Sequence, residues 1–366
     1  MAATHDFGRL PANARSTPTP FKVEVPDSKL IELKSLIAAG KVGPTTYEGL
    51  QADRRYGIDD KWLQEAKEAW LEFDWREVEA EINVFSHYKA SVSHAGQDFD
   101  IHFIALFSER DDAVPILMLH GWPGSFMEFV PIFRLLKQKY TPTDLPYHII
   151  VPSLPGLQGG DVGSKVARVL GGIHPRAKAI HLNFCIMSDP GNFTPDQYTA
   201  AEKQGLLRAQ EFARKGSAYA LEHATRPSTI ALVLASNPIA LLAWVGEKML
   251  EWTDTPLPLL TILADVTLYW LTDSISTSLW PYRQLFTPGN VGAHENPEWF
   301  IRKPMGFSWF PKEIAPVPRR WVETTRDAVF YREHESGGHF AALEVPEVLL
   351  GDLEEFVGVV RGRGVI

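Results

Sequence analysis

Hydrophobic residues along the first third of the chain follow first a helical and then a strand-like spacing. Residues 1–20 contain three prolines among small polar residues and predict an irregular arm. In 28–37 and 61–72 apolar residues recur every three or four positions, which predicts helices. Apolar and polar residues then alternate in 82–92 and 99–106, and this alternation predicts two strands.

From residue 114 onward the pattern changes to that of alternating strands and helices. Residues 114–119 are a nearly continuous apolar run, which is typical of a strand buried on both faces. An amphipathic helix is predicted over 126–137, and a second buried strand over 147–151. This order predicts a parallel sheet with right-handed crossovers.

The second half contains a long helical block. Residues 192–299 consist mainly of helix-like stretches rich in Trp and Tyr. Strand-like runs return at 305–310 and 328–334, and 343–360 predicts a closing helix. A helical block between two stretches of strand–helix pattern predicts an α/β fold in which a helical lid is inserted into a sheet domain.

Composition and charge exclude several classes of protein. The 366 residues are 45% hydrophobic and carry a formal net charge of -9, which excludes a disordered chain and disfavours a nucleic-acid binder. Cys185 is the single cysteine, so an internal disulfide is excluded and a reducing, cytoplasmic location is expected.

No membrane or targeting segment is expected either. The N-terminal residues show no basic stretch followed by an apolar one, so we expect no signal peptide. The longest apolar region, 229–245, is interrupted by Ser-Asn-Pro at 236–238. It therefore predicts two buried pieces and not a membrane span.

A glycine-rich hexapeptide at 159–164, Gly-Gly-Asp-Val-Gly-Ser, surrounds Asp161 with small residues. Such neighbours are needed where a sharp turn presents a nucleophile, because bulkier residues would clash. A carboxylate is ionised at pH 7 and needs no base to act as a nucleophile. Taken alone, the hexapeptide fits better a glycine-rich turn whose Asp caps the next helix.

The sequence His-Gly-Trp-Pro-Gly-Ser at 120–125 directly follows the first predicted buried strand. A loop so rich in glycine can aim backbone N–H groups outward, as an oxyanion hole requires. The N–H of Val162, beside Asp161, would be the partner donor. Taken alone, the sequence of this loop fits an ordinary strand-to-helix turn about as well as it fits an oxyanion hole.

Gly-Gly-His-Phe at 337–340 lies after the last predicted strand and before the closing helix. A histidine there can reach the turn at Asp161, although a surface or core position suits most of the 12 histidines. Glu313 follows a strand and lies between Asp161 and His339 in the chain, as an acid partner should. The order Asp161, Glu313, His339 is the nucleophile–acid–histidine order of α/β-hydrolase folds.

These motifs together resemble those of the microsomal class of epoxide hydrolases, in its soluble fungal form. The resemblance covers nearly the whole chain and includes segments outside the three motifs above. The matching segments are 73–76, 120–125, 153–156, 159–164, 225–229, 236–240, 246–248 and 337–340.

The resemblance implies an α/β-hydrolase fold with a helical lid and an N-terminal wrapping segment. The implied division is an N-terminal arm at 1–90, a first part of the core at 91–190, the lid at 191–300 and a second part of the core at 301–366. It also implies a soluble protein that dimerises through its lid.

The activity implied is the hydrolysis of a small lipophilic epoxide to a vicinal diol, without metal or cofactor, as in xenobiotic detoxification. Asp161 would attack an epoxide carbon and form an alkyl ester. Two lid tyrosines hold the epoxide oxygen in the family, and Tyr219 and Tyr282 match them by their motifs. Only the resemblance singles these two out from the 10 tyrosines.

The second half of the implied reaction hydrolyses this ester. His339 would take a proton from water, and Glu313 would hold the imidazole tautomer and stabilise the imidazolium. The oxyanion would lie against the backbone N–H groups of Trp122 and Val162.

The sequence departs from the family just before Asp161. Only nine residues, 152–160, separate the strand that ends at Val151 from Asp161, where the family places a helix and then a strand. An average helix of about 11 residues and a strand of about 5 need roughly 16. The segment also has too many Gly and Pro residues for a central strand. We therefore predict that one helix and most of the strand before Asp161 are missing.

Three explanations stay open for the short segment. It reflects an error in the gene structure or alternative splicing, which we favour; or the protein is an inactive relative; or the strand at 147–151 shifts into the vacant place. A missing central strand exposes apolar edges and leaves backbone groups unpaired, so we predict low stability or aggregation on expression.

Three functions compete with epoxide hydrolysis. A catalytically impaired relative that only binds lipophilic molecules is the main alternative, because of the short segment. A haloalkane dehalogenase also uses an Asp nucleophile, but the tyrosine pair argues against it. A serine esterase would need Ser164 as nucleophile, and Ser164 has no sharp turn of small residues around it.

Overall fold

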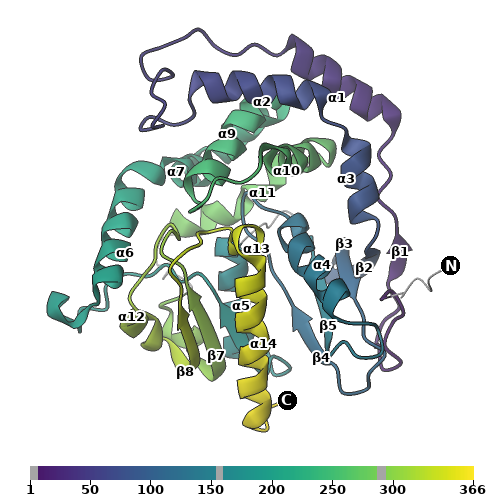
Figure 1. Cartoon of the computed structure of the whole chain (residues 1–366), viewed down its shortest axis with the longest axis vertical. Coiled ribbons are helices and arrows are strands. Elements are labelled where there is room, and N and C mark those ends of the chain that lie inside the picture. Colours follow the sequence, from purple (N-terminus) through teal and green to yellow (C-terminus); the bar gives the residue numbers. More distant parts are fainter. Residues whose placement is uncertain (1–6, 154–159, 287–293) are drawn as a thin grey trace.

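The described strands form two β-sheets, which lie below the helical block in the view of Figure 1. The computed structural model describes residues 7–153, 160–286 and 294–366, with the backbone alone for Gly160, Asp161 and 284–286. The first sheet has the order β1-β2-β3-β5-β4 and the second the order β6-β7-β8. The strands are β1 (Thr19–Phe21), β2 (Ser86–His94), β3 (Gln97–Leu106), β4 (Val114–Leu117), β5 (Tyr147–Pro152), β6 (Ile180–Leu182), β7 (Ile301–Trp309) and β8 (Arg326–Glu333).

The pairing of the strands confirms the predicted parallel part of the sheet. β4 and β5 are parallel, with Ile116 opposite Ile149, and the helix α4 (Val130–Lys139) lies between them in the chain. β6, β7 and β8 are also parallel. The strands predicted from alternation, β2 and β3, form an antiparallel hairpin, and β3 pairs antiparallel with β5.

The prediction that 114–119 is buried on both faces is wrong. In the described residues β4 pairs only with β5, so it forms an edge of the first sheet. Leu117 is consequently 51% exposed. The apolar pattern of β4 suits a strand with neighbours on both sides, and the neighbour toward β6 is missing from the described residues.

The position of β5 decides one of the open explanations for the short segment. β5 lies between β3 and β4 and hydrogen-bonds to both. It therefore has not moved to the far side of β4, and the explanation that it replaces the missing strand is wrong. After β5 ends at Pro152, the next described element is the helix α5 (Gly160–Ile173).

Helices cover the sheets and form the predicted block above them (Figure 1). The predicted closing helix is present as α13 (Ala341–Glu344) and α14 (Pro346–Gly362). The short helices of the core are η1 (Phe126–Phe129), η5 (Pro297–Trp299) and α12 (Arg319–Glu323). The helices between β6 and β7 in the chain include η2 (Pro195–Gln197), α6 (Ala200–Glu211), η3 (Phe212–Gly216), α7 (Ala218–Thr225), α8 (Pro227–Ser236), α9 (Pro238–Glu251), α10 (Leu259–Leu271), α11 (Ile275–Ser278) and η4 (Trp280–Phe286).

The N-terminal segment wraps around both the lid and the first sheet (Figure 1). Its helices are α1 (Asp27–Ala39), α2 (Asp60–Glu72) and α3 (Trp75–Ile82), and its strand β1 extends the first sheet. A single hydrophobic cluster joins Leu33 and Trp70 of these helices to Leu241 and Ile262 of the lid. The four-part division of the chain stays a prediction.

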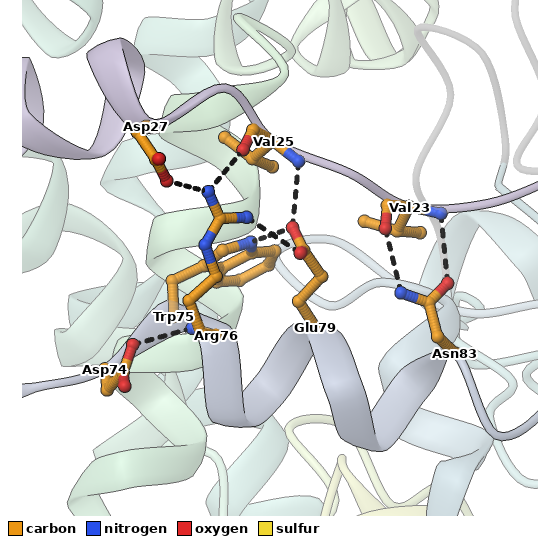
Figure 2. A network of polar contacts seen from close by, with 8 residues as sticks. All are labelled: Val23, Val25, Asp27, Asp74, Trp75, Arg76, Glu79 and Asn83. Atoms are coloured by element: carbon orange, nitrogen blue, oxygen red, sulfur yellow. Dashed lines mark hydrogen bonds and ion pairs between the residues drawn. The ribbon is translucent and has the colours of Figure 1, made fainter.

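Polar contacts fix this segment at the start of α3 (Figure 2). The Glu79 carboxylate accepts hydrogen bonds from Val25 N at 2.8 Å and from Arg76 Nη1 at 2.7 Å. Arg76 Nη2 donates to Val25 O at 2.7 Å and also pairs with Asp27. The Asn83 amide exchanges two hydrogen bonds with the backbone of Val23. The motif at 73–76 therefore serves to hold the extended chain before α1.

Within the described ranges, no single helix combines the length and apolar composition that crossing a membrane requires. α8 and α9 pass such a test only when they are joined, and a bend of 114° separates them.

Candidate active site

A buried histidine–carboxylate pair lies where loops from the second sheet meet. His339 follows β8, and Glu313 follows β7. Their closest atoms, His339 Nδ1 and Glu313 Oε1, are 2.5 Å apart. The side chains are only 2% and 3% exposed, so water screens this hydrogen bond little.

Hydrogen bonds from the backbone of the His339 loop hold it to the lid and to α13. His339 N donates to Trp252 O at 2.8 Å, and Gly338 N donates to the Glu344 carboxylate at 3.1 Å. Gly337 has φ of +102°, a conformation that favours glycine, and its N–H donates to Asp254. The glycines before His339 therefore allow the turn that points its ring inward.

The loop that carries Glu313 is held by the lid as well. The Arg208 guanidinium of α6 donates to Glu313 O at 2.7 Å and to Lys312 O at 2.8 Å. Ile314 N donates to Glu313 Oε1 at 2.6 Å. The lid helix α6 thus sets the position of the loop that carries Lys312 and Glu313.

Both predicted lid tyrosines pack against Trp122. The Trp122 and Tyr219 rings are stacked with centroids 5.2 Å apart, and the Tyr282 ring meets Trp122 edge-on at 5.7 Å. The two tyrosine rings are themselves 5.7 Å apart. All three residues are nearly or fully buried. Tyrosines from α7 and η4 therefore converge on the loop at 120–125.

Trp252 connects the tyrosine cluster to the histidine. Its ring lies 5.1 Å from that of His339 and 5.3 Å from that of Tyr219. The structure thus brings His339, Glu313, Tyr219, Tyr282 and Trp122 into one buried cluster between core and lid.

His223 and Lys248 belong to the same cluster but were not found by sequence reasoning. The His223 ring lies 4.7 Å from Trp122 and 4.8 Å from Tyr282. Burial, and then the charge of Lys248, lower the pKa of His223 to about 3, so the ring is neutral. Trp244 donates to His223 Nε2 at 3.0 Å, which places the ring proton on Nδ1.

Lys248 is 2% exposed, and its ammonium lies 5.2 Å from the centre of the Tyr219 ring. It also pairs with Glu247 at 2.5 Å. In the sequence, Lys248 stood out only as part of the Gly-Glu-Lys segment at 246–248, which resembles the family. Nothing in the sequence indicated that its side chain lies beside Tyr219.

Asp161 and Val162 lie in the first turn of α5, but the side chain of Asp161 is outside the described residues. The backbone of Gly163 in this turn lies against the backbone of His120. A Cβ added at Gly163 would be only 2.8 Å from His120 O, so no larger residue fits there. The start of α5 therefore packs closely against the beginning of the loop at 120–125. The distance between the Asp161 carboxylate and His339 stays a prediction.

Ser164, the nucleophile of the esterase alternative, has a structural contact instead. Its hydroxyl hydrogen-bonds to His294 Nε2 at 3.1 Å, and His294 Nδ1 bonds to Ile186 O at 3.0 Å. Ser164 is 5% exposed and lies within α5. A helical, buried serine is poorly placed to attack a substrate.

Comparisons with known proteins show to which family the chain belongs. Residues 18–129 match the family model described as "Epoxide hydrolase N terminus". A protein of Dothistroma septosporum named "Putative epoxide hydrolase" is 42% identical over 98% of this chain and 94% of its own length. The chain belongs to the epoxide hydrolase family.

Solved structures of epoxide hydrolases share the fold. The Aspergillus niger epoxide hydrolase is 46% identical and superposes with a TM-score of 0.90, covering 97% of this chain and 100% of the other. The juvenile hormone epoxide hydrolase of the silkworm Bombyx mori, at 23% identity, has a TM-score of 0.83 over 95% and 96% of the two chains. The fold is therefore that of α/β-hydrolases with a lid, as expected.

The alignment with the Dothistroma relative also bears on the short segment. The alignment spans 398 positions, whereas the present chain has 366 residues. At least 32 aligned positions (398 − 366) therefore hold a residue of the relative and a gap in the present chain. Together with the sheet edge at β4, this number agrees with the loss of a helix and a strand from this chain.

Proposed function

We propose that this protein hydrolyses an epoxide to a vicinal diol through an ester intermediate on Asp161. The observation that carries the proposal is the buried His339–Glu313 pair, which Trp252 connects to Tyr219 and Tyr282. This combination suits a reaction that first protonates an oxygen leaving group and then activates a water.

In the first half-reaction the Asp161 carboxylate attacks an epoxide carbon, and the C–O bond of the ring breaks. The hydroxyl groups of Tyr219 and Tyr282 hydrogen-bond to the epoxide oxygen, and one of them gives it a proton. The stacking of Tyr219 on Trp122 supports this role, because it fixes the ring before the substrate binds.

In the second half-reaction His339 takes a proton from water, and the hydroxide attacks the ester carbonyl. Glu313 accepts from His339 Nδ1, so that Nε2 is the nitrogen that takes the proton. The resulting oxyanion accepts hydrogen bonds from the N–H groups of Trp122 and Val162. The close packing of Gly163 on His120 supports this pairing of α5 with the loop at 120–125.

The missing helix and strand are compatible with this chemistry. A helix followed by a parallel strand begins and ends at the same edge of a sheet, so removing the unit leaves two nearby chain ends. Strands are about 4.8 Å apart, and the step from β5 across β4 is about 10 Å. A chain extends about 3.3 Å per residue, so the connection from Pro152 to Gly160 is long enough.

The chemistry of the cluster favours a lipophilic substrate. Aromatic rings of Trp122, Tyr219, Tyr282 and Trp252 surround the tyrosine hydroxyls, and each of these residues is at most 6% exposed. A small aryl or alkyl epoxide would bury its apolar part against these rings. Dimerisation through the lid and a cytoplasmic location stay predictions.

The test is incubation of the protein with styrene oxide, followed by diol analysis and by mass spectrometry of the intact protein. We expect diol from the unchanged protein, none from Asp161→Asn, and a covalent substrate adduct that accumulates on His339→Gln. If folded His339→Gln protein never carries an adduct, the scheme is wrong. Binding of styrene oxide without any diol would favour the non-catalytic alternative.

A further inference from the structure

The lid helix α9 buries a lysine beside one of the two tyrosines that are expected to hold the epoxide oxygen. The Nζ atom of Lys248 lies 5.2 Å from the centre of the Tyr219 ring and 4.5 Å from the centre of the Trp244 ring. Both distances are within the range in which an ammonium group is attracted to the face of an aromatic ring. Lys248 therefore places a positive charge against Tyr219.

The charge of Lys248 is not simply cancelled by its neighbour Glu247. Glu247 Oε1 and Lys248 Nζ are 2.5 Å apart, so the two form an ion pair. The Glu247 side chain is 31% exposed, whereas the Lys248 side chain is 3% exposed. Because water screens an exposed charge more than a buried one, the carboxylate is weakened more than the ammonium. The pair thus directs its positive end into the buried cluster between core and lid.

His223 shows that this positive charge is felt inside the cluster. After burial, the charge of Lys248 is the second cause that lowers the pKa of His223 to about 3. The His223 ring is neutral at this pKa and lies 5.4 Å from the Tyr219 ring. The ammonium of Lys248 therefore acts on the neighbourhood of Tyr219, and His223 adds no second positive charge.

We propose that Lys248 is a positioning residue that holds the Tyr219 ring and stabilises the negative charge that forms on its oxygen during ring opening. The inference rests on the proposed function, in which one of the two lid tyrosines gives a proton to the epoxide oxygen. It extends that function by naming Tyr219 as the proton donor and by giving a buried lysine, which does not touch the substrate, a part in the reaction.

The proton can be followed through one turnover. As Asp161 forms its bond to carbon, the C–O bond of the ring breaks, and its electron pair stays on the oxygen. Tyr219 gives this oxygen a proton and becomes a phenolate. In the second half-reaction hydroxide adds to the ester carbonyl, and the diol leaves with the proton that His339 took from water. The proton of the added hydroxide remains on the Asp161 carboxyl group and then restores Tyr219.

This sequence predicts an effect on one half-reaction. The charge on Tyr219 forms on the way to the ester and is already present when hydrolysis begins, so removing the ammonium slows ester formation and leaves hydrolysis nearly unchanged. General acid catalysis contributes about 10²–10⁴-fold to a rate. Lys248→Met keeps the length of the side chain without its charge, and we expect it to slow ester formation at least about tenfold.

The experiment compares Lys248→Met with Lys248→Arg and Glu247→Gln. Single-turnover kinetics with styrene oxide gives the rates of ester formation and hydrolysis separately. Lys248→Arg keeps a positive charge, so it should form the ester faster than Lys248→Met. Glu247→Gln is the matched control, because it removes the neighbouring charge and leaves the ammonium in place. Ester formation in this control should be no slower than in the unchanged protein.

A second background links the effect to the tyrosine. In protein that already carries Tyr219→Phe there is no phenol to ionise, so adding Lys248→Met should change ester formation less than about twofold. Tenfold slowing in both backgrounds would overturn the proposal, because the lysine would then act without the tyrosine. Equal slowing of both half-reactions by Lys248→Met would overturn it as well.

A readout without turnover is the binding of 4-nitrophenol, whose phenolate form is yellow. A positive charge in the cluster favours the phenolate form of the bound molecule. At pH 7 we expect a smaller share of bound phenolate in Lys248→Met than in the unchanged protein or in Glu247→Gln. Equal shares would overturn the proposal. If the unchanged protein forms no ester, the proposed function fails, and this absorbance alone decides whether Lys248 stabilises negative charge in the cluster.

Discussion

At the scale of single residues, the account depends on buried polar groups that have few but specific partners. His339 and Glu313 come from loops 26 residues apart in sequence, and their 2.5 Å contact is shielded from water. A pair of this kind fixes the imidazole tautomer and stabilises the imidazolium during the reaction. Removing its charge should therefore affect chemistry far more than stability.

We predict that Glu313→Gln slows ester hydrolysis by about 10³–10⁴-fold, in analogy with the loss of the acid from a serine-protease triad. Asp352→Asn is the matched control. It disrupts another histidine–carboxylate contact, the part-buried one between Asp352 and His334 at 2.6 Å, outside the site cluster. Single-turnover rates should fall in the first variant only. Comparable rates of hydrolysis in both variants would refute the role of Glu313.

The pH dependence of stability provides a second test at this scale. Burial in the lid helix α10 raises the folded-state pKa of Asp265 to about 7, whereas an unfolded Asp titrates near 3.8. The folded state therefore binds more protons between these values, and its stability falls as pH rises from about 4 to about 7. A difference of about three pH units corresponds to about 4 kcal/mol at most.

We expect Asp265→Asn to remove this loss of stability, so that the variant exceeds the unchanged protein in stability above pH 7. Urea unfolding at pH 5 and pH 8 measures the effect. If the two proteins lose equal stability between these pH values, Asp265 is not protonated in the folded state.

The sequence was sufficient to predict that His339 and Glu313 meet, because each follows a strand and their order is informative, and their catalytic roles stay predictions. Their geometry could not be predicted, since it depends on the packing of loops from separate strands. His223 and Asp265 have no local pattern at all. Their importance comes from burial between segments distant in sequence, such as α10 and the loop at 120–125.

At the scale of elements, the N-terminal segment shows how polar contacts add to a hydrophobic interface with the lid. Glu79 holds Val25 N, Trp75 Nε1 and Arg76 in one place (Figure 2). Helical periodicity predicted α1 and α2 well. It could not show that residues near 20 form a strand, because β1 exists only through its pairing with β2.

We predict that Glu79→Ala destabilises the protein by about 1–3 kcal/mol, because it leaves part-buried N–H donors without a partner. Glu77→Ala, on the exposed face of the same helix, should change stability by less than about 0.5 kcal/mol. Denaturant unfolding compares the two variants. Equal midpoints would mean that the contacts of Figure 2 add nothing to stability.

At the scale of the whole molecule, the separation of the two sheets is the main difference from the expected family fold. The apolar pattern of β4 predicted a strand buried on both faces, and Leu117 is instead half exposed. Local pattern cannot reveal this, since burial of a strand depends on a neighbour elsewhere in the chain. The short segment before Asp161 was the part of the sequence that predicted the missing strand between the two sheets.

An exposed apolar strand edge favours association between chains. We predict that the protein aggregates on expression and that Leu117→Lys lowers the aggregated fraction in size-exclusion chromatography. Leu207→Lys is the control, since Leu207 is also exposed, at 57%, but lies on helix α6. The prediction fails if both variants act alike, or if the unchanged protein is monodisperse and melts cooperatively above about 65 °C.

The most direct test of the central claim follows solvent oxygen into the protein. In water labelled with oxygen-18, repeated turnover through an ester on Asp161 transfers label to its carboxyl group, because hydroxide attacks the ester carbonyl. Peptide mass spectrometry should find the label in the peptide that contains Asp161 and not in that of Asp265. Diol formation over many turnovers with an unlabelled Asp161 would contradict the account.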